Sequence, residues 1–235
     1  VAADAGADAC KFQWCSSPLR LAERRHAQDY QAAYTRLAFP PAWLDELAEE
    51  CTQAGLEFMC TVYLPEDIAT VAPLVKRFKV ASFESQDGEF LDAHAPYHKP
   101  VIASCSGSDP AWNRFVATPS GGVTVYSLHC VAAYPTPVDE MNLLAIRRDA
   151  WDGLSDHSGF WLTGALAVAA GAQIVEVHFR LDSTPPDDPD YLHSLSPWDL
   201  DRYIATLRCA ERMLGDGRKR MMPSEQRWVR YKVRP

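Results

Sequence analysis

Polar and charged side chains lie at or near the C-terminal ends of several short apolar runs in this sequence. The set comprises Lys11, Gln13, Thr61, Lys79, Ser82, Glu84, Ser104, Ser127, His129, Asp156, His157, Glu176 and His178. A single such residue has an ordinary structural explanation, since a lysine at a strand end commonly extends to solvent. Together they are groups that bind anions, hold metal ions and transfer protons. Their recurrence predicts an active site where these runs converge.

Two of the histidines, His129 and His157, lie on runs that we expect to be neighbouring strands. Two neutral imidazoles with additional oxygen ligands suit a divalent ion such as Mn²⁺, Fe²⁺, Co²⁺ or Zn²⁺. Two protein ligands leave several coordination positions for water and substrate, as a Lewis-acid catalyst requires. The pair therefore predicts a catalytic metal site.

Two cations and three hydroxyls of the same set predict an anion site, composed of Lys11, Thr61, Lys79, Ser82 and Ser127. Lysine and hydroxyl donors form strong, charge-assisted hydrogen bonds to phosphate oxygens, so a phosphate-bearing substrate fits this inventory. Glu84 follows closely after Lys79 in the sequence. We expect Glu84 to act there as a general acid or base.

The elements that would position these residues alternate between strand and helix. Seven apolar runs of strand length carry few internal charges, at residues 9–14, 56–63, 78–82, 100–104, 123–130, 153–158 and 174–179. Stretches with helical spacing of apolar residues lie between or after them, at 41–54, 161–171 and 197–214. This alternation predicts an α/β fold with a parallel sheet that is covered on its faces.

Seven strands are one fewer than a closed (β/α)8 TIM barrel contains. We therefore expect a single barrel domain over residues 1–235 whose first strand, with about thirty residues, precedes Val1 in the protein. An open, doubly wound sheet is the competing fold. That fold usually has a glycine-rich phosphate loop after its first strand, and the segment KFQWCSSP at 11–18 does not resemble one.

The charge and the amino-acid composition of the chain exclude some classes of function. The chain has 235 residues and a formal net charge of −8, which argues against a general nucleic-acid binder. Apolar runs fall short of the ~18 residues needed to cross a bilayer, so we expect no membrane association. The seven cysteines form no CxxC pair and most lie in apolar runs. Reduced, buried thiols in a cytoplasmic protein are the expected state.

Several longer motifs occur in an order that resembles a known family. They are GLEFMCTVY (55–63), FKVASFES (78–85), KPVIASCS (99–106), SLHCVAAYPTPVDEMNL (127–143), GLSDHS (153–158), GAQIVEVHF (171–179) and DYLHSLSP (190–197). In this order they resemble the catalytic barrel of the N-acetylneuraminate (sialic acid) synthase family, which includes legionaminic and pseudaminic acid synthases. The resemblance extends from about Ala2 to about Glu225.

The resemblance implies a reaction and assigns residues to it. It implies condensation of phosphoenolpyruvate with an aldose such as an acetamido sugar, with a divalent metal, most often Mn²⁺, although Mg²⁺ or Co²⁺ would also serve. His129 and His157 match the metal-ligand positions, and Glu84 matches the acidic position beside the reacting carbons. Phosphoenolpyruvate would be held by Lys11, Thr61, Lys79, Ser82 and Ser127, and the acceptor sugar by Gln13 and Asp190. Glu84, His157 and Lys79 would be the catalytic residues.

The sequence also departs from the family pattern. Phe83 replaces the usual glycine, and Val177 replaces a lysine or arginine. We also expect a divergent member that lacks the family's C-terminal antifreeze-like domain. A homodimer is compatible with the sequence. These departures concern the acceptor half of the site. Two other functions stay open: a metal-dependent keto-acid aldolase or lyase on the same barrel, and a non-catalytic sugar- or phosphate-binding barrel.

Overall fold

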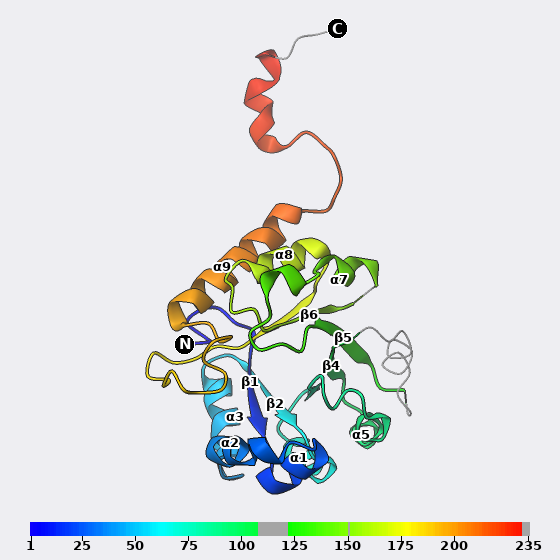
Figure 1. Ribbon diagram of the computed structural model, residues 1–235. Coiled ribbons are helices and arrows are strands. Elements are labelled where there is room, and N and C mark those ends of the chain that lie inside the picture. The colour runs from blue at the N-terminus through cyan, green and yellow to red at the C-terminus, as the bar shows by residue number, and fades with distance from the viewer. Residues whose placement is uncertain (108–121, 150, 232–235) are drawn as a thin grey trace.

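A computed structural model describes residues 1–107, 122–149 and 151–231 of the 235-residue chain. Its centre is a curled sheet of seven parallel strands that follow one another in chain order (Figure 1). The strands are β1 Ala9–Trp14, β2 Glu57–Val62, β3 Phe78–Val80, β4 Val101–Cys105, β5 Val125–Cys130, β6 Gly153–Asp156 and β7 Ile174–Val177. All seven predicted strands therefore form, most of them slightly shorter than expected.

The strand order decides between the two candidate folds. Each strand pairs in parallel with the next, from β1 to β7, and the order never reverses. A doubly wound sheet requires such a reversal, so that alternative is excluded. Within the described residues β1 and β7 are the two edges of the sheet and do not pair with each other. The structure thus shows a curled, parallel seven-stranded sheet, and the closed eight-stranded barrel stays a prediction.

Helices lie around the outer side of the curled sheet (Figure 1). They are α1 Pro18–Arg24, α2 Gln31–Leu37, α3 Trp43–Gln53, α4 Ile68–Val71, α5 Gly88–Asp92, α7 Leu144–Arg148, α8 Thr163–Ala170 and α9 Pro197–Leu214. The three predicted helices correspond to α3, α8 and α9. Ser196 caps α9 by accepting a hydrogen bond from the backbone N–H of Asp199, and Pro197 occupies the first turn, as sequence patterns predict.

Successive residues of each strand point to opposite faces of the sheet, and this alternation separates the core from the interior cavity. Outward residues such as Phe58, Val80 and Val101 pack in the main hydrophobic cluster under the helices. Inward residues such as Lys11 and Lys79 line a cavity of about 2040 Å³. The fold therefore places the polar side chains of the strands inside the curl.

A glycine in α8 sets how closely the last two helices pack. A Cβ atom at Gly164 would lie 2.4 Å from the ring of Tyr203 in α9. The fully buried Tyr203 hydroxyl in turn donates a 2.9 Å hydrogen bond to Asp156 at the end of β6. This contact fixes the strand end that carries the next residue, His157.

All seven cysteines have free thiols, and five of them are buried, as the sequence indicates. Within residues 1–107, 122–149 and 151–231, no helix combines the length and the apolar character needed to cross a bilayer.

Candidate functional site

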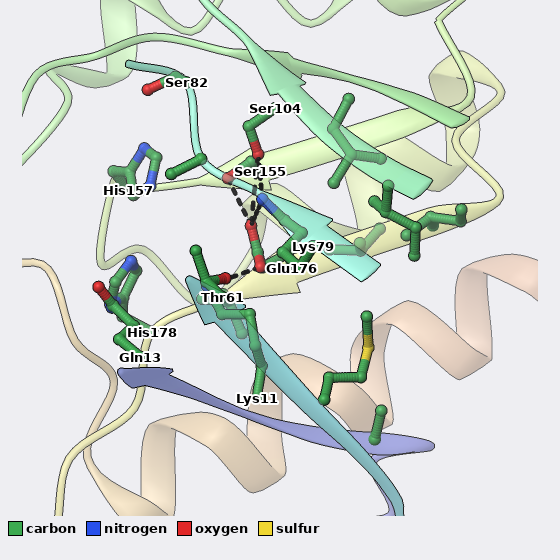
Figure 2. A pocket seen from close by; sticks show the side chains of 18 of the residues that line it. Lys11, Gln13, Thr61, Lys79, Ser82, Ser104, Ser155, His157, Glu176 and His178 are labelled. Carbon is green, nitrogen blue, oxygen red and sulfur yellow. Dashed lines mark hydrogen bonds and ion pairs between the residues drawn. The ribbon is translucent and has the colours of Figure 1, made fainter. Parts of the chain in front are cut away.

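A partly buried carboxylate, Glu176, lies at the centre of the interior polar cluster (Figure 2). Its side chain forms ion pairs with Lys11 at 2.9 Å and with Lys79 at 3.2 Å. It also accepts a 2.8 Å hydrogen bond from Ser155 on the neighbouring strand β6. Four strands that are distant in sequence thus meet at one carboxylate. The cluster holds two ammonium groups against one carboxylate, which makes it a site for an additional anion.

Lys79 is the more deeply buried of the two lysines, with 3% of its surface exposed. Its Nζ donates hydrogen bonds to Ser104 Oγ at 2.7 Å and to the Val80 carbonyl at 3.0 Å. Burial lowers the pKa of Lys79, and the charge of Glu176 opposes this effect only in part. Burial would raise the pKa of Glu176, but Lys11 and Lys79 hold that pKa well below its usual value. An incoming anion would favour the charged form of Lys79.

Hydroxyl groups line the same cavity next to the lysines. Thr61 Oγ1 is buried and has no hydrogen-bond partner among the described residues. A buried hydroxyl without a hydrogen-bond partner lowers the stability of the fold unless a ligand supplies the missing partner. Ser82, which is 3% exposed, also lines the cavity, and Gln13 accepts a hydrogen bond from the Tyr63 hydroxyl. Thr61 and Ser82 are therefore placed to donate to an anion held by the lysines.

The carboxylate of Glu84 pairs with a neighbouring arginine. Both of its oxygens accept hydrogen bonds from Arg25, at 2.7 and 2.9 Å. Burial would lower the pKa of Arg25, but Glu84 raises it above its usual value. The Arg25 guanidinium also lies over the rings of Tyr63 and Phe83, at 4.7 and 5.2 Å. Glu84 thus lines the cavity as expected, but as the partner of Arg25 rather than of a lysine.

Phe83, the bulky departure from the family pattern, does not fill the cavity. Its side chain is 55% exposed and lies at the rim, next to Arg25. Phe83 therefore contacts Arg25 and takes no part in the ion pairs of Lys11, Lys79 and Glu176.

His157 lies just beyond β6 and is nearly buried. Its ring centroid is 4.4 Å from that of Tyr134 and 5.3 Å from that of His178. Burial, with a further contribution from His178, lowers the pKa of His157 to about 3. The imidazole is therefore neutral near pH 7, which is the form that binds metals or accepts hydrogen bonds.

Two of the predicted site residues lie outside the cavity. Ser127 and His129 belong to β5, whose cavity-facing residue is Leu128 between them. His129 Nε2 lies 2.9 Å from the Met141 carbonyl on the outer side of the sheet, and Ser127 Oγ donates to Asp152. Because neighbouring strand residues face opposite ways, Leu128 inward means His129 outward. The expected pairing of His129 with His157 is corrected accordingly, as is the expected contact of Ser127 with the anion.

The remaining predicted residues all line the same cavity: Lys11, Gln13, Thr61, Lys79, Ser82, Glu84, His157 and Asp190. Glu176 and His178 belong to the set of polar strand-end residues but received no role from the sequence; they also line the cavity, as does His193, which the sequence did not indicate. A signal for two of them was present, because Glu176 and His178 are two residues apart and must share a face of β7 and its extension. His193 gave no comparable signal, since it lies on a loop that folds back.

Asp190 lies between two histidines of this cavity. One oxygen lies 3.3 Å from His178 Nδ1, and the other lies 3.4 Å from His193 Nε2. Burial would raise the pKa of Asp190, but its interactions with His178 and His193 hold that pKa well below its usual range. Asp190 is therefore an ionised ligand or acceptor within reach of both imidazoles.

The depressed pKa of His157 predicts a loss of stability in acid. The unfolded chain binds this proton below about pH 6.5, whereas the folded chain resists it down to about pH 3. The contribution of the neutral His157 imidazole to the free energy of unfolding is thus fully present above pH 6.5. It decreases by about 1.4 kcal/mol for each unit by which the pH falls through that window. We expect His157→Gln to show a shallower fall between pH 6.5 and 4.5 in urea unfolding. Parallel curves for parent and variant would contradict this.

Comparison with known proteins gives consistent relationships. The model of the NeuB family matches residues 1–219. The uncharacterized protein MJ1065 of Methanocaldococcus jannaschii is 32% identical over 94% of this chain and 67% of its own length. The N,N'-diacetyllegionaminic acid synthase of Legionella pneumophila is 30% identical over 96% of this chain and 70% of its own.

A solved structure shares the fold over nearly the whole chain. The N-acetylneuraminic acid (sialic acid) synthetase of Leptospira borgpetersenii, crystallised with citrate, superposes with a TM-score of 0.83. The two sequences are 26% identical, and the match covers 98% of this chain and 82% of the other.

Proposed function

The chain belongs to the NeuB family, and we propose that it condenses phosphoenolpyruvate with an aldose of the acetamido-sugar type. The products would be a 2-keto-3-deoxy sugar acid and inorganic phosphate. The relatives named as a legionaminic acid synthase and a sialic acid synthetase support this class of reaction. The observation that carries it in this chain is the partly buried cluster of Lys11, Lys79 and Glu176, with hydroxyl donors in the same cavity.

The cluster suits phosphoenolpyruvate because that substrate carries a carboxylate and a phosphate. Lys11 and Lys79 supply the positive charge, and Thr61 and Ser82 offer hydroxyls in the same cavity. Charge-assisted hydrogen bonds are stronger than neutral ones, and they gain further strength where side chains are shielded from solvent. Glu176 keeps the two ammonium groups at fixed positions before substrate arrives. This pre-arrangement would hold the reacting carbon in register with the acceptor.

The proposed reaction balances without a redox partner. C3 of phosphoenolpyruvate forms a bond to the aldehyde carbon, and the aldehyde oxygen takes up a proton. Water adds its oxygen to C2, and the C2–O bond to phosphate then breaks, leaving the ketone. Lysine charges near the phosphate would stabilise the negative charge that the leaving group retains.

The divalent ion implied by the family, Mn²⁺ or alternatively Mg²⁺ or Co²⁺, would polarise the acceptor aldehyde when bound. The residues first expected to hold it do not fit as a pair. His129 and His157 lie on opposite sides of the sheet, and His129 is already within hydrogen-bond distance of the Met141 carbonyl.

An acceptor screen tests the proposed function. Purified protein with Mn²⁺ is incubated with phosphoenolpyruvate and a panel of 2-acetamido and other aldoses, and phosphate release and product mass are measured. We expect phosphate release only when both substrates are present, with a product mass equal to aldose plus pyruvate. Release from phosphoenolpyruvate alone, or none with any aldose, would contradict the proposal.

The lowered pKa of Lys79 also suits a keto-acid aldolase of the Schiff-base type, which differs from the metal-dependent aldolase or lyase that the sequence left open, because neutral lysines form Schiff bases with carbonyl substrates. Borohydride treatment with pyruvate distinguishes the two reactions by mass spectrometry. The condensation leaves Lys79 unmodified, whereas an aldolase of the Schiff-base type would gain a reduced adduct at that residue.

A further inference from the structure

We propose that Arg25 is a positioning residue for the acceptor aldose, and that it acts by fixing the carboxylate of Glu84. Arg25 directly follows α1, and Glu84 lies beyond β3, 59 residues later in the chain. Nε and Nη2 of Arg25 donate to different oxygens of Glu84, at 2.7 and 2.9 Å. Both side chains line the cavity. This inference rests on the proposed function and adds a residue that the sequence patterns did not indicate.

Aromatic side chains hold the Arg25 guanidinium in its place. The guanidinium carbon lies 4.7 Å from the ring centroid of Tyr63 and 5.2 Å from that of Phe83. Nη1 also donates a 3.4 Å hydrogen bond to the Tyr34 hydroxyl. A planar guanidinium can stack on rings while it donates two parallel hydrogen bonds to a carboxylate, which an ammonium group cannot do. These contacts therefore restrict the orientation of Arg25 and, with it, that of Glu84.

A second series of contacts connects Arg25 with Gln13, which we expect to contact the acceptor. The Tyr63 ring faces Arg25, and the Tyr63 hydroxyl donates to Gln13 Oε1. Burial raises the pKa of Tyr63 well above its usual value, so this hydroxyl keeps the proton that it donates. Arg25 thus contacts Glu84 directly and Gln13 through Tyr63.

Glu84 retains capacity to accept hydrogen bonds after it pairs with Arg25. An ionised carboxylate has about four lone-pair positions, and the two bonds from Arg25 occupy only part of them. The pair carries no net charge, so a neutral hydroxyl of an aldose suits it better than an anion does. The anionic phosphoenolpyruvate suits Lys11 and Lys79 instead. The two substrates would therefore be recognised by different groups within one cavity.

Steady-state kinetics with each substrate varied in turn tests this role of Arg25. In Arg25→Ala we expect kcat/KM for the aldose to fall about 10²-fold, because a small displacement of a positioned group has an effect of that size. KM for phosphoenolpyruvate should stay close to that of the parent, since Lys11 and Lys79 are unchanged. Arg25→Lys keeps the charge without the planar pair of donors, so it should recover only part of the loss.

Two further measurements separate positioning from a purely structural role. Guanidinium ion, added to Arg25→Ala at concentrations too low to unfold it, should restore part of the rate, whereas sodium chloride at equal ionic strength should not. The double variant Arg25→Ala with Glu84→Gln should lose no more activity than Glu84→Gln alone, because independent residues would give losses that multiply. Arg20→Ala is the matched control, because Arg20 lies on the same helix and pairs with Glu66, and neither lines the cavity.

Circular dichroism establishes that each variant is folded before its rates are compared. If Arg25→Ala does not fold, Arg25→Lys and the double variant decide, because the double variant leaves no buried carboxylate without a partner. A folded Arg25→Ala as active as the parent, or losses that multiply in the double variant, would overturn the role of Arg25 and leave the proposed reaction standing. A parent that releases no phosphate with any aldose would reject the reaction, and the role of Arg25 with it.

Discussion

Replacing Lys79 with methionine is expected to lower kcat/KM for phosphoenolpyruvate by about 10²–10³-fold. Methionine preserves the length of the buried stem but removes the ammonium group that donates to Ser104 and pairs with Glu176. The substrate phosphate or carboxylate then loses a charged donor in a buried site, where such a donor is worth most. Glu176 keeps Lys11 and Ser155 as partners, so the fold should tolerate the change.

The matched control is Lys76→Met, because Lys76 lies three residues earlier and its side chain is exposed. Initial rates of phosphate release at varied phosphoenolpyruvate give kcat/KM for parent, variant and control. The control should match the parent. A Lys79→Met enzyme within threefold of the parent would show that the anion binds elsewhere.

Replacing Glu176 with glutamine is expected to lower the free energy of unfolding by about 3–5 kcal/mol at neutral pH. The amide leaves Lys11 and Lys79 without their shared counter-ion, and both ammonium groups then repel each other in a buried site. Burial already lowers the pKa of Lys79, and removal of the carboxylate takes away the charge that opposes this effect. Urea unfolding followed by circular dichroism measures the loss.

Asp216→Asn is the control for this second change, because Asp216 forms an ion pair with Arg220 in which both side chains are about half exposed. An ion pair open to solvent contributes only about 0–1 kcal/mol. The double variant Lys79→Met with Glu176→Gln should recover part of the loss, since one uncompensated cation is removed. A loss below about 1 kcal/mol in Glu176→Gln alone would contradict a central role for this carboxylate.

Local patterns in the sequence predicted the elements well. Each predicted strand is an apolar run with few charges, and each forms close to its expected bounds because it pairs on both sides or lies against a helix. The long helix α9 was predicted with its correct ends, since Ser196 and Pro197 mark its start. Short helices such as α4 and α5 have too few residues to show a helical period, so the sequence did not indicate them.

The sequence placed site residues correctly in most strands that end in one polar residue, or in two polar residues separated by one position. Lys11 and Gln13 are two residues apart and both line the cavity. In β5 the same reasoning failed, because an inward Leu128 turns Ser127 and His129 to the outer side. Composition alone does not reveal which of two adjacent residues faces inward; packing of the whole strand does.

By itself, then, the sequence determined the parallel α/β class, the order of its strands and a cavity rich in lysine and hydroxyl groups. Those features depend on residues that are near one another in the chain. Only the tertiary structure decided that Glu176 forms ion pairs with both lysines and that Arg25 forms an ion pair with Glu84. It also decided that Asp190 and His193 fold back onto His178. Such contacts join distant segments, and they form only when the sheet curls and its loops close over the strand ends.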